Sequence, residues 1–213
     1  MTALLIIIYL GTLLYLSLSV NIKNYINLIG AQGIILFGIA ILELQQLDMV
    51  HFVFILMETL VFKAVIVPML LYRISKRNKI FNLQNNRTHR KTKGFNMVVI
   101  TSLVIAACFI FSYDLHDNHL EIKYFTAAIS SIILGILFIT VNRNSIIHLI
   151  SFLVIENGVF LLALAVGGEM PMIINGAILL DIFSSVLLIG IFLNRIGQFF
   201  NNVESGHLTK LKD

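Results

Sequence analysis

Long apolar segments recur along the whole of this 213-residue chain, and they constrain its fold more than any other feature. Hydrophobic residues make up 58% of the chain and charged residues 12%, which is about half the charged share of a soluble domain. Runs of about 18 or more apolar residues can cross a membrane as helices. The period-2 alternation of a membrane β-barrel is absent, so backbone groups must be satisfied within each helix. The sequence therefore predicts an all-α, polytopic transmembrane helical bundle.

We expect about seven membrane spans, arranged in two membrane units. The predicted spans are 3–20, 25–47, 50–74, 95–113, 124–141, 145–166 and 170–197. The predicted regions are an N-terminal three-helix membrane unit at 1–75, a basic cytoplasmic loop at 76–94, a C-terminal four-helix membrane unit at 95–200 and a cytoplasmic tail at 201–213.

The charged residues predict how the bundle is oriented. Basic residues follow spans one, three, five and seven, and they are densest in the loop after span three, whereas the alternate loops are mainly acidic. Because cytoplasmic loops are enriched in Lys and Arg, we expect the N-terminus outside and the C-terminus in the cytoplasm. The net charge of +4 then reflects membrane sidedness rather than nucleic-acid binding.

Three carboxylates, Glu58, Glu156 and Asp181, lie within these apolar segments. Ionisable groups inside a membrane are costly and rare, and they usually belong to ion or proton pathways. Glu156 is about eleven residues into its span, or roughly 16 Å at 1.5 Å per residue, and so near mid-membrane. We expect Asp181 at a similar depth in the next, antiparallel span, where the two carboxylates could exchange a proton.

Other polar residues accompany this predicted carboxylate pair. Ser184 and Ser185 follow Asp181 by about one turn, and they either hydrate it or pack helices together. His148 precedes Glu156 by about two turns. It either shuttles protons from the cytoplasm or lies at the membrane interface.

Lys63 shares the third predicted span with Glu58. Five residues in an α-helix separate the two by about 140°, so a regular i,i+4 pair is not expected. We expect Lys63 to reach a carboxylate on another helix or another subunit. Pro68 frees a backbone carbonyl nearby. Lys63 is either a group that changes its charge state or one half of a static salt bridge.

The two halves of the chain show a weak internal repeat. Gln32-Gly33 corresponds to Asn157-Gly158, and Glu58 corresponds to Asp181. The repeat is parallel and predicts duplication of a three-helix unit, with span four inserted between the copies. The GAQG and IENG glycines are expected only to pack helices.

Several chemistries have no motif in the sequence. There is no Cys/His cluster with metal spacing and no glycine-rich phosphate loop. The single cysteine, Cys108, excludes a disulfide framework and is expected to pack as a small apolar residue. We therefore expect no catalytic residue, metal or cofactor in this chain.

The C-terminal unit, from about residue 124, resembles the K subunit of respiratory complex I and the C subunit of Mrp-type sodium/proton antiporters. Relative to complex I, Glu156 stands about one turn later and the second acid is Asp rather than Glu. The whole chain is more similar to the hydrogenase-4 component E family. The shared motifs are Glu156-Asn157-Gly158 after Arg143-Asn144, Asp181 in the next helix, Lys63 through Val67-Pro68, and Leu208 to Lys212. Glu58 is not part of this family pattern.

The resemblance implies a non-catalytic membrane-arm subunit of a complex I-related nickel–iron hydrogenase or formate hydrogenlyase-type complex. Such a subunit lies in the bacterial cytoplasmic (inner) membrane beside antiporter-like membrane subunits and peripheral hydrogenase subunits. Glu156 and Asp181 would form the proton relay, and Lys63 would be a coupling charge. Two alternatives stay open: a subunit of a cation/proton antiporter without electron transfer, and a purely structural membrane subunit.

Overall fold

The computed structural model describes residues 1–19, 21–43, 56–77, 90–114, 121–142 and 144–166, with the isolated positions 53 and 190. Every element within the described ranges is a helix, which confirms the predicted all-α class for this part of the chain. The elements are α1 (Thr2–Leu18), α2 (Ile22–Glu43), η1 (Leu56–Ile66), α4 (Val67–Arg77), α6 (Arg90–Asp114), α7 (Ile122–Val141) and α8 (Ser145–Val166).

Four helical segments among the described residues are long and apolar enough to cross a membrane. They are Ile22–Leu42, Asn96–Asp114, Ile122–Val141 and Ile146–Ala165. These correspond to the second, fourth, fifth and sixth predicted spans. The first predicted span corresponds to α1, whose 17 residues stand at the short end of the spanning range. The third corresponds to η1 and α4. The seventh and the tail lie outside the described residues, apart from Gly190.

Beside its apolar core, the described bundle buries several polar side chains, and it leaves many apolar side chains exposed. On α6, for example, Leu103, Phe109 and Ile110 are exposed while Thr101 and Ser112 are buried. Exposed apolar surface on this scale is unfavourable in water. In a bilayer the same distribution is favourable, because lipid solvates the apolar faces and polar groups find partners inside.

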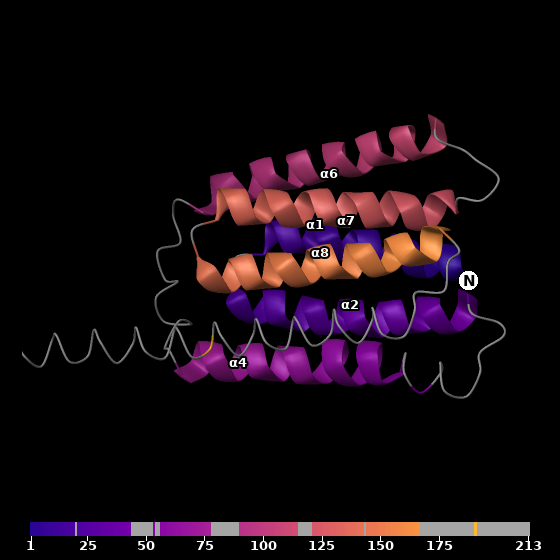
Figure 1. Cartoon of the computed structure of the whole chain (residues 1–213). Helices are drawn as coiled ribbons and strands as arrows, with labels where there is room; N and C mark the ends of the chain where they lie inside the picture. Colours follow the sequence, from indigo (N-terminus) through magenta and orange to yellow (C-terminus); the bar gives the residue numbers. More distant parts are fainter. Residues whose placement is uncertain are drawn as a thin grey trace, which may run out of the picture.

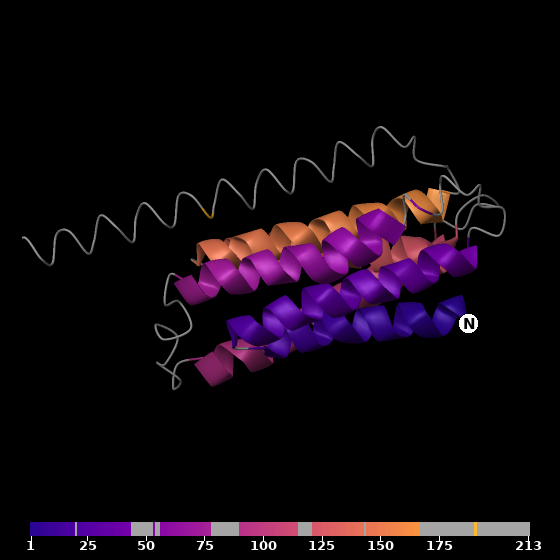
Figure 2. The same cartoon turned by 90° about the horizontal axis from the view of Figure 1, so that it is seen from below.

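The helices run in alternating directions, with η1 and α4 as one continuous stretch, and successive helices lie side by side except α4 and α6, which lie at opposite edges of the bundle (Figure 1). The N-terminus therefore lies at the same end of the bundle as the ends of α2, α6 and α8, while α1, α4 and α7 end at the opposite end. The most extensive contact joins α7 and α8, an antiparallel hairpin between the end of α7 at Val141 and the start of α8 at Ser145. α2 is central, because it contacts α1, η1, α4 and α8 (Figure 2).

Glycines allow the closest helix contacts. A Cβ atom at Gly158 would lie 2.9 Å from the Ala128 carbonyl oxygen of α7, and one at Gly33 would lie 2.9 Å from the Ala64 nitrogen of η1. Real side chains do not fit at such distances, so the two backbones meet directly, as small residues permit in membrane bundles. The expectation that these glycines pack helices is confirmed.

The third predicted span is not a continuous α-helix. Leu56–Ile66 is π-helical, and α-helical geometry begins only at Val67. Pro68 stands at this junction and has no N–H to continue the hydrogen-bond ladder in either geometry. The hydrogen bond of a π-helix joins residues five apart. The expectation that Glu58 and Lys63 stand about 140° apart, which rested on α-helical geometry, is therefore wrong, because these positions share one side of η1.

Candidate functional site

A buried ion pair joins the two halves of the chain. Lys63 Nζ of η1 lies 2.9 Å from Glu156 Oε1 of α8, and both side chains are buried. Lys63 thus reaches a carboxylate on another helix, as the sequence predicted. Burying two charges is costly, and their attraction offsets that cost only when they stay paired. Lys63 and Glu156 therefore form a buried contact between opposite charges inside the described bundle.

The ring of Phe160 also lies against the ammonium group. Its ring centroid lies 5.0 Å from Lys63 Nζ, within the range of a cation–π contact. Phe160 is four residues after Glu156, so both side chains project from one face of α8. α8 thus supplies a carboxylate and an aromatic face to one lysine, and together they hold the Nζ position.

The Glu156 carboxylate accepts no well-directed hydrogen bond from any residue that the structure describes. The 2.9 Å approach of Lys63 acts chiefly as an ion pair at Oε1, because charge attraction depends weakly on direction. Oε2 has no donor within the described ranges. Chemically, this oxygen can accept a proton without displacing another hydrogen bond.

A chain of amides and hydroxyls extends from the neighbour of Glu156. Asn157 Nδ2 donates to Gln32 Oε1 at 3.1 Å, and Gln32 Nε2 donates to Thr12 Oγ1 at 2.9 Å. Thr12 Oγ1 in turn donates to the Tyr9 carbonyl oxygen at 2.6 Å. These bonds connect α8 to α2 and α2 to α1, and Asn157 and Gln32 are both buried.

A second set of hydrogen bonds returns from α1 to α8. The Tyr9 hydroxyl lies 2.8 Å from Ser131 Oγ, and Ser131 Oγ donates to the Val154 carbonyl oxygen at 2.9 Å. Since a serine hydroxyl carries one hydrogen, Tyr9 must donate to Ser131. We call the six residues of these two sets the polar ring: Tyr9, Thr12, Gln32, Ser131, Val154 and Asn157.

Two residues of the polar ring, Val154 and Asn157, precede and follow Glu156 on α8. Both of its sets end on backbone carbonyl oxygens, those of Val154 and Tyr9, which do not release a proton. The ring therefore fixes the rotation and height of four helices around Glu156 and does not conduct protons itself. The sequence indicated Asn157 and Gln32 but not Tyr9, Thr12 or Ser131, because hydroxyls are common in membrane helices and carry no distinctive spacing.

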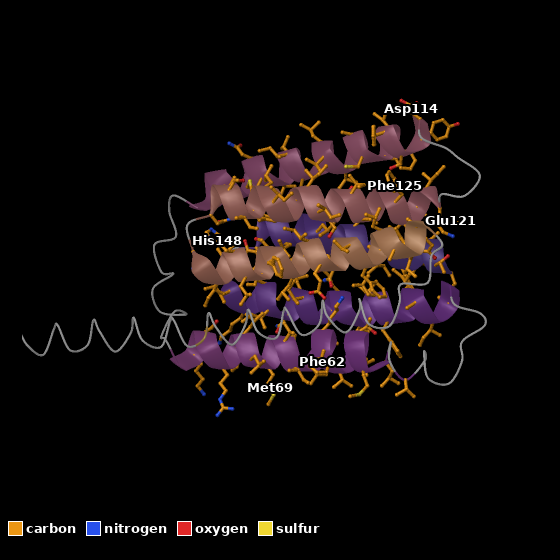
Figure 3. The ribbon with its side chains drawn as sticks, in the orientation of Figure 1. Phe62, Met69, Asp114, Glu121, Phe125 and His148 are labelled. Atoms are coloured by element: carbon orange, nitrogen blue, oxygen red, sulfur yellow. The ribbon has the colours of Figure 1, made fainter. Side chains whose placement is uncertain are left out.

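His148 lies at the end of the bundle where α7 and α8 join, and Glu121 lies at the opposite end (Figure 3). The His148 Nε2 atom contacts the Asn142 carbonyl oxygen of the hairpin turn. This placement is the one an interfacial residue would occupy. Glu121 pairs with Lys123 at 3.2 Å near the surface.

Several predicted residues cannot be placed against this site. Asp181, Ser184 and Ser185 lie outside the described residues, as does the side chain of Glu58. Cys108 is buried on α6. Among the residues that the structure describes, no group of three or more His, Cys, Asp or Glu side chains could hold a metal ion.

Comparisons with protein-family models, with curated proteins and with solved structures found no match.

Proposed function

We propose that this chain is a membrane-arm subunit of a complex I-related nickel–iron hydrogenase or formate hydrogenlyase-type complex and contributes to proton translocation. The Lys63–Glu156 pair is the observation that carries the proposal. The motif that begins at Lys63 and the motif that begins at Glu156 are the two central elements of the resemblance to hydrogenase-4 component E. Their first residues meet inside the bundle.

In this proposal Glu156 and Asp181 form the mid-membrane relay and Lys63 is the coupling charge. Glu58 and His148 are further relay positions, and Asn157, Ser184 and Ser185 support the relay. Charge changes in neighbouring subunits would drive proton movement. They would change the electric field at Lys63, and with it the strength of the attraction between Lys63 and Glu156. Antiporter-like membrane subunits and peripheral hydrogenase subunits are the proposed partners.

We propose seven spans: two parallel three-helix units, with span four inserted between them. α2 and α8 run in the same direction (Figure 1), as a parallel repeat requires. Gln32 and Asn157, which are equivalent positions of the repeat, hydrogen-bond to each other at 3.1 Å. Equivalent residues meet in this way when they stand at the axis that relates the two units.

We further propose that the chain lies in the bacterial cytoplasmic membrane with its N-terminus outside and its C-terminus in the cytoplasm. The ends of α1, α4 and α7 lie together, so the basic segments that follow them in the sequence begin on one side. That side is cytoplasmic by the positive-inside rule.

Mass spectrometry of proteins that co-purify with the tagged chain in mild detergent tests the parent complex. We expect a nickel–iron hydrogenase large subunit together with antiporter-like proteins. Antiporter-like subunits without any redox protein would instead identify an ion exchanger. Recovery of the chain alone would contradict both assignments.

The substitution Glu156→Gln tests the relay. We expect proton translocation by the intact complex to fall at least about tenfold, because Gln cannot carry a proton between donor and acceptor. Glu121→Gln, at the exposed end of α7, is the matched control and should leave translocation unchanged. Unchanged translocation in assembled Glu156→Gln complex would refute the relay, and loss of assembly would favour a purely structural subunit.

A further inference from the structure

One face of α4 changes from apolar to basic along its length. Met69, Tyr72, Arg73 and Lys76 stand at the i, i+3, i+4 and i+7 positions, so they share one side of the helix. All four side chains are exposed. Val65 of η1, four residues before Met69, is also exposed and extends the apolar part of this face. We call these five residues the α4 stripe.

The α4 stripe lies on the outer edge of the bundle. α4 packs mainly against η1 and α2, and Met69 projects from the side of α4 that faces away from α2 (Figure 3). The rise from Val65 to Lys76 is roughly 16 Å at 1.5 Å per residue, which is about half of a 30 Å hydrocarbon core. The stripe therefore has the length of one lipid leaflet, and its basic residues stand at the headgroup end.

The basic end of the α4 stripe has no acidic complement in its own part of the sequence, because no Asp or Glu occurs between Glu58 and Asp114. The carboxylates whose side chains the structure describes lie elsewhere. Glu156 pairs with Lys63 inside the bundle, whereas Asp114 and Glu121 lie at the opposite end from the end of α4 (Figure 3). An arginine and a lysine about one turn apart near a membrane surface attract phosphate groups. The charge of this surface is therefore complementary to an anion supplied from outside the chain.

We propose that the α4 stripe binds an anionic phospholipid of the leaflet at this end of the bundle, which is cytoplasmic in the proposed orientation. The lipid phosphate lies between Arg73 and Lys76, and an acyl chain runs along Met69 and Val65. Tyr72 stands at the depth where aromatic residues meet the membrane–water interface. The proposal depends on the membrane placement of the bundle and is independent of the hydrogenase assignment and of the relay.

The two parts of the α4 stripe contribute differently to binding. Lipid chains are as apolar as the side chains they contact, so Met69 and Val65 fix the depth of the lipid without selecting it. Arg73 and Lys76 provide the selection, since each basic residue near the surface strengthens attraction to anionic lipid. Basic residues that only orient a span act through their number and side of the membrane. A binding site depends instead on these two positions.

Titration of the full chain in mild detergent with dioleoyl phosphatidylglycerol, followed by native mass spectrometry, tests the site. Dioleoyl phosphatidylcholine is the neutral comparison lipid. The test variant combines Arg73→Gln with Lys76→Gln. The matched control combines Lys23→Gln with Lys123→Gln, because it removes the same charge from two lysines outside the stripe.

We expect the parent chain to bind phosphatidylglycerol at least about tenfold more tightly than phosphatidylcholine. The Arg73→Gln, Lys76→Gln variant should lose about tenfold in affinity for phosphatidylglycerol, and the control should keep the parent affinity. Arg73→Lys, which keeps the charge, should bind almost as tightly as the parent chain. If the double variant does not accumulate, Arg73→Gln and Lys76→Gln are measured singly, and each should lose about threefold or more.

Equal losses in the test and control variants would overturn the proposal, because they would show that only the number of charges matters. A parent chain without a preference for phosphatidylglycerol would overturn it as well. So would an acidic protein that co-purifies with the parent chain and is released from the test variant while lipid affinity stays unchanged. None of these results bears on proton translocation by Glu156→Gln complex, so failure of the lipid site and failure of the relay are distinguishable.

Discussion

Lys63 and Glu156 are buried together, and each depends on the other for its charge to be tolerated. A buried ion pair contributes little net stability, but removal of one partner leaves an uncompensated charge that costs about 3–5 kcal/mol. A packed interface of apolar residues would stabilise the same contact at lower cost. A pair at this depth is therefore better explained by a need for charge inside the membrane than by a need for stability.

Tyr9, together with Thr12, holds α1 to this site. We expect Tyr9→Phe to lower the free energy of unfolding by about 1 kcal/mol, because Ser131 loses the hydrogen bond from the Tyr9 hydroxyl while the ring still fills its space. Tyr15→Phe, on the exposed face of the same helix, should have no measurable effect. Chemical unfolding followed at Cys108 measures both. Equal effects of the two variants would contradict a role for the Tyr9 hydroxyl in the polar ring.

The sequence predicted that Lys63 reaches a carboxylate on another helix or another subunit, and it singled out Glu156 as a buried acid. It did not pair the two, because the contact depends on how α8 packs beside η1. The positions of the two residues in the sequence do not predict that contact. The expected separation of Glu58 and Lys63 failed for a different reason, since it assumed α-helical geometry where the backbone is π-helical.

Helix packing depends on a few glycines placed opposite backbone atoms. We expect Gly158→Ala to destabilise the chain by about 1–3 kcal/mol, since its Cβ would lie 2.9 Å from the Ala128 carbonyl oxygen and must push α7 away from α8. The same movement would stretch the bond between Ser131 Oγ and the Val154 carbonyl oxygen.

Gly11→Ala is the matched control, because a Cβ atom at Gly11 meets nothing within 4 Å. It should be neutral or slightly stabilising, since Ala favours a helix over Gly by roughly 1 kcal/mol. Melting curves of both variants in nanodiscs measure the difference. A Gly158→Ala chain as stable as Gly11→Ala would show that the α7–α8 contact is looser than the structure places it.

The helices themselves followed from the sequence, because apolar runs of membrane length admit few other structures. Spans four to six were predicted to within a few residues of α6, α7 and α8, apart from the extra turn at the start of α6. The π-helical segment was not predictable from the same pattern. It arises where Pro68 cannot continue the hydrogen-bond ladder and Gly33 lets α2 press against the backbone at Ala64.

Across the whole described bundle, an apolar core also holds buried amides, hydroxyls and the Lys63–Glu156 ion pair, while leucine, isoleucine and phenylalanine side chains cover much of the outside. Since lipid is as apolar as these side chains, burial of apolar surface does not by itself hold helices together in a membrane, and close backbone packing and hydrogen bonds must contribute. The glycines and the polar ring supply both.

This arrangement makes a definite prediction of sidedness. Alternating helix directions place Lys76 and Asn144 at one end of the bundle and Asp114 and Glu121 at the other. We expect cysteines introduced at Asp114 and Glu121 to react with an impermeant maleimide added to intact spheroplasts. Cysteines at Lys76 and Asn144 should react only after permeabilisation, because the basic side is cytoplasmic. The parent chain, with Cys108 buried, provides the unlabelled control.

Labelling of all four positions from one side would contradict the bundle, whereas an exchange of the two sides would keep the bundle and reverse the orientation inferred from its charges.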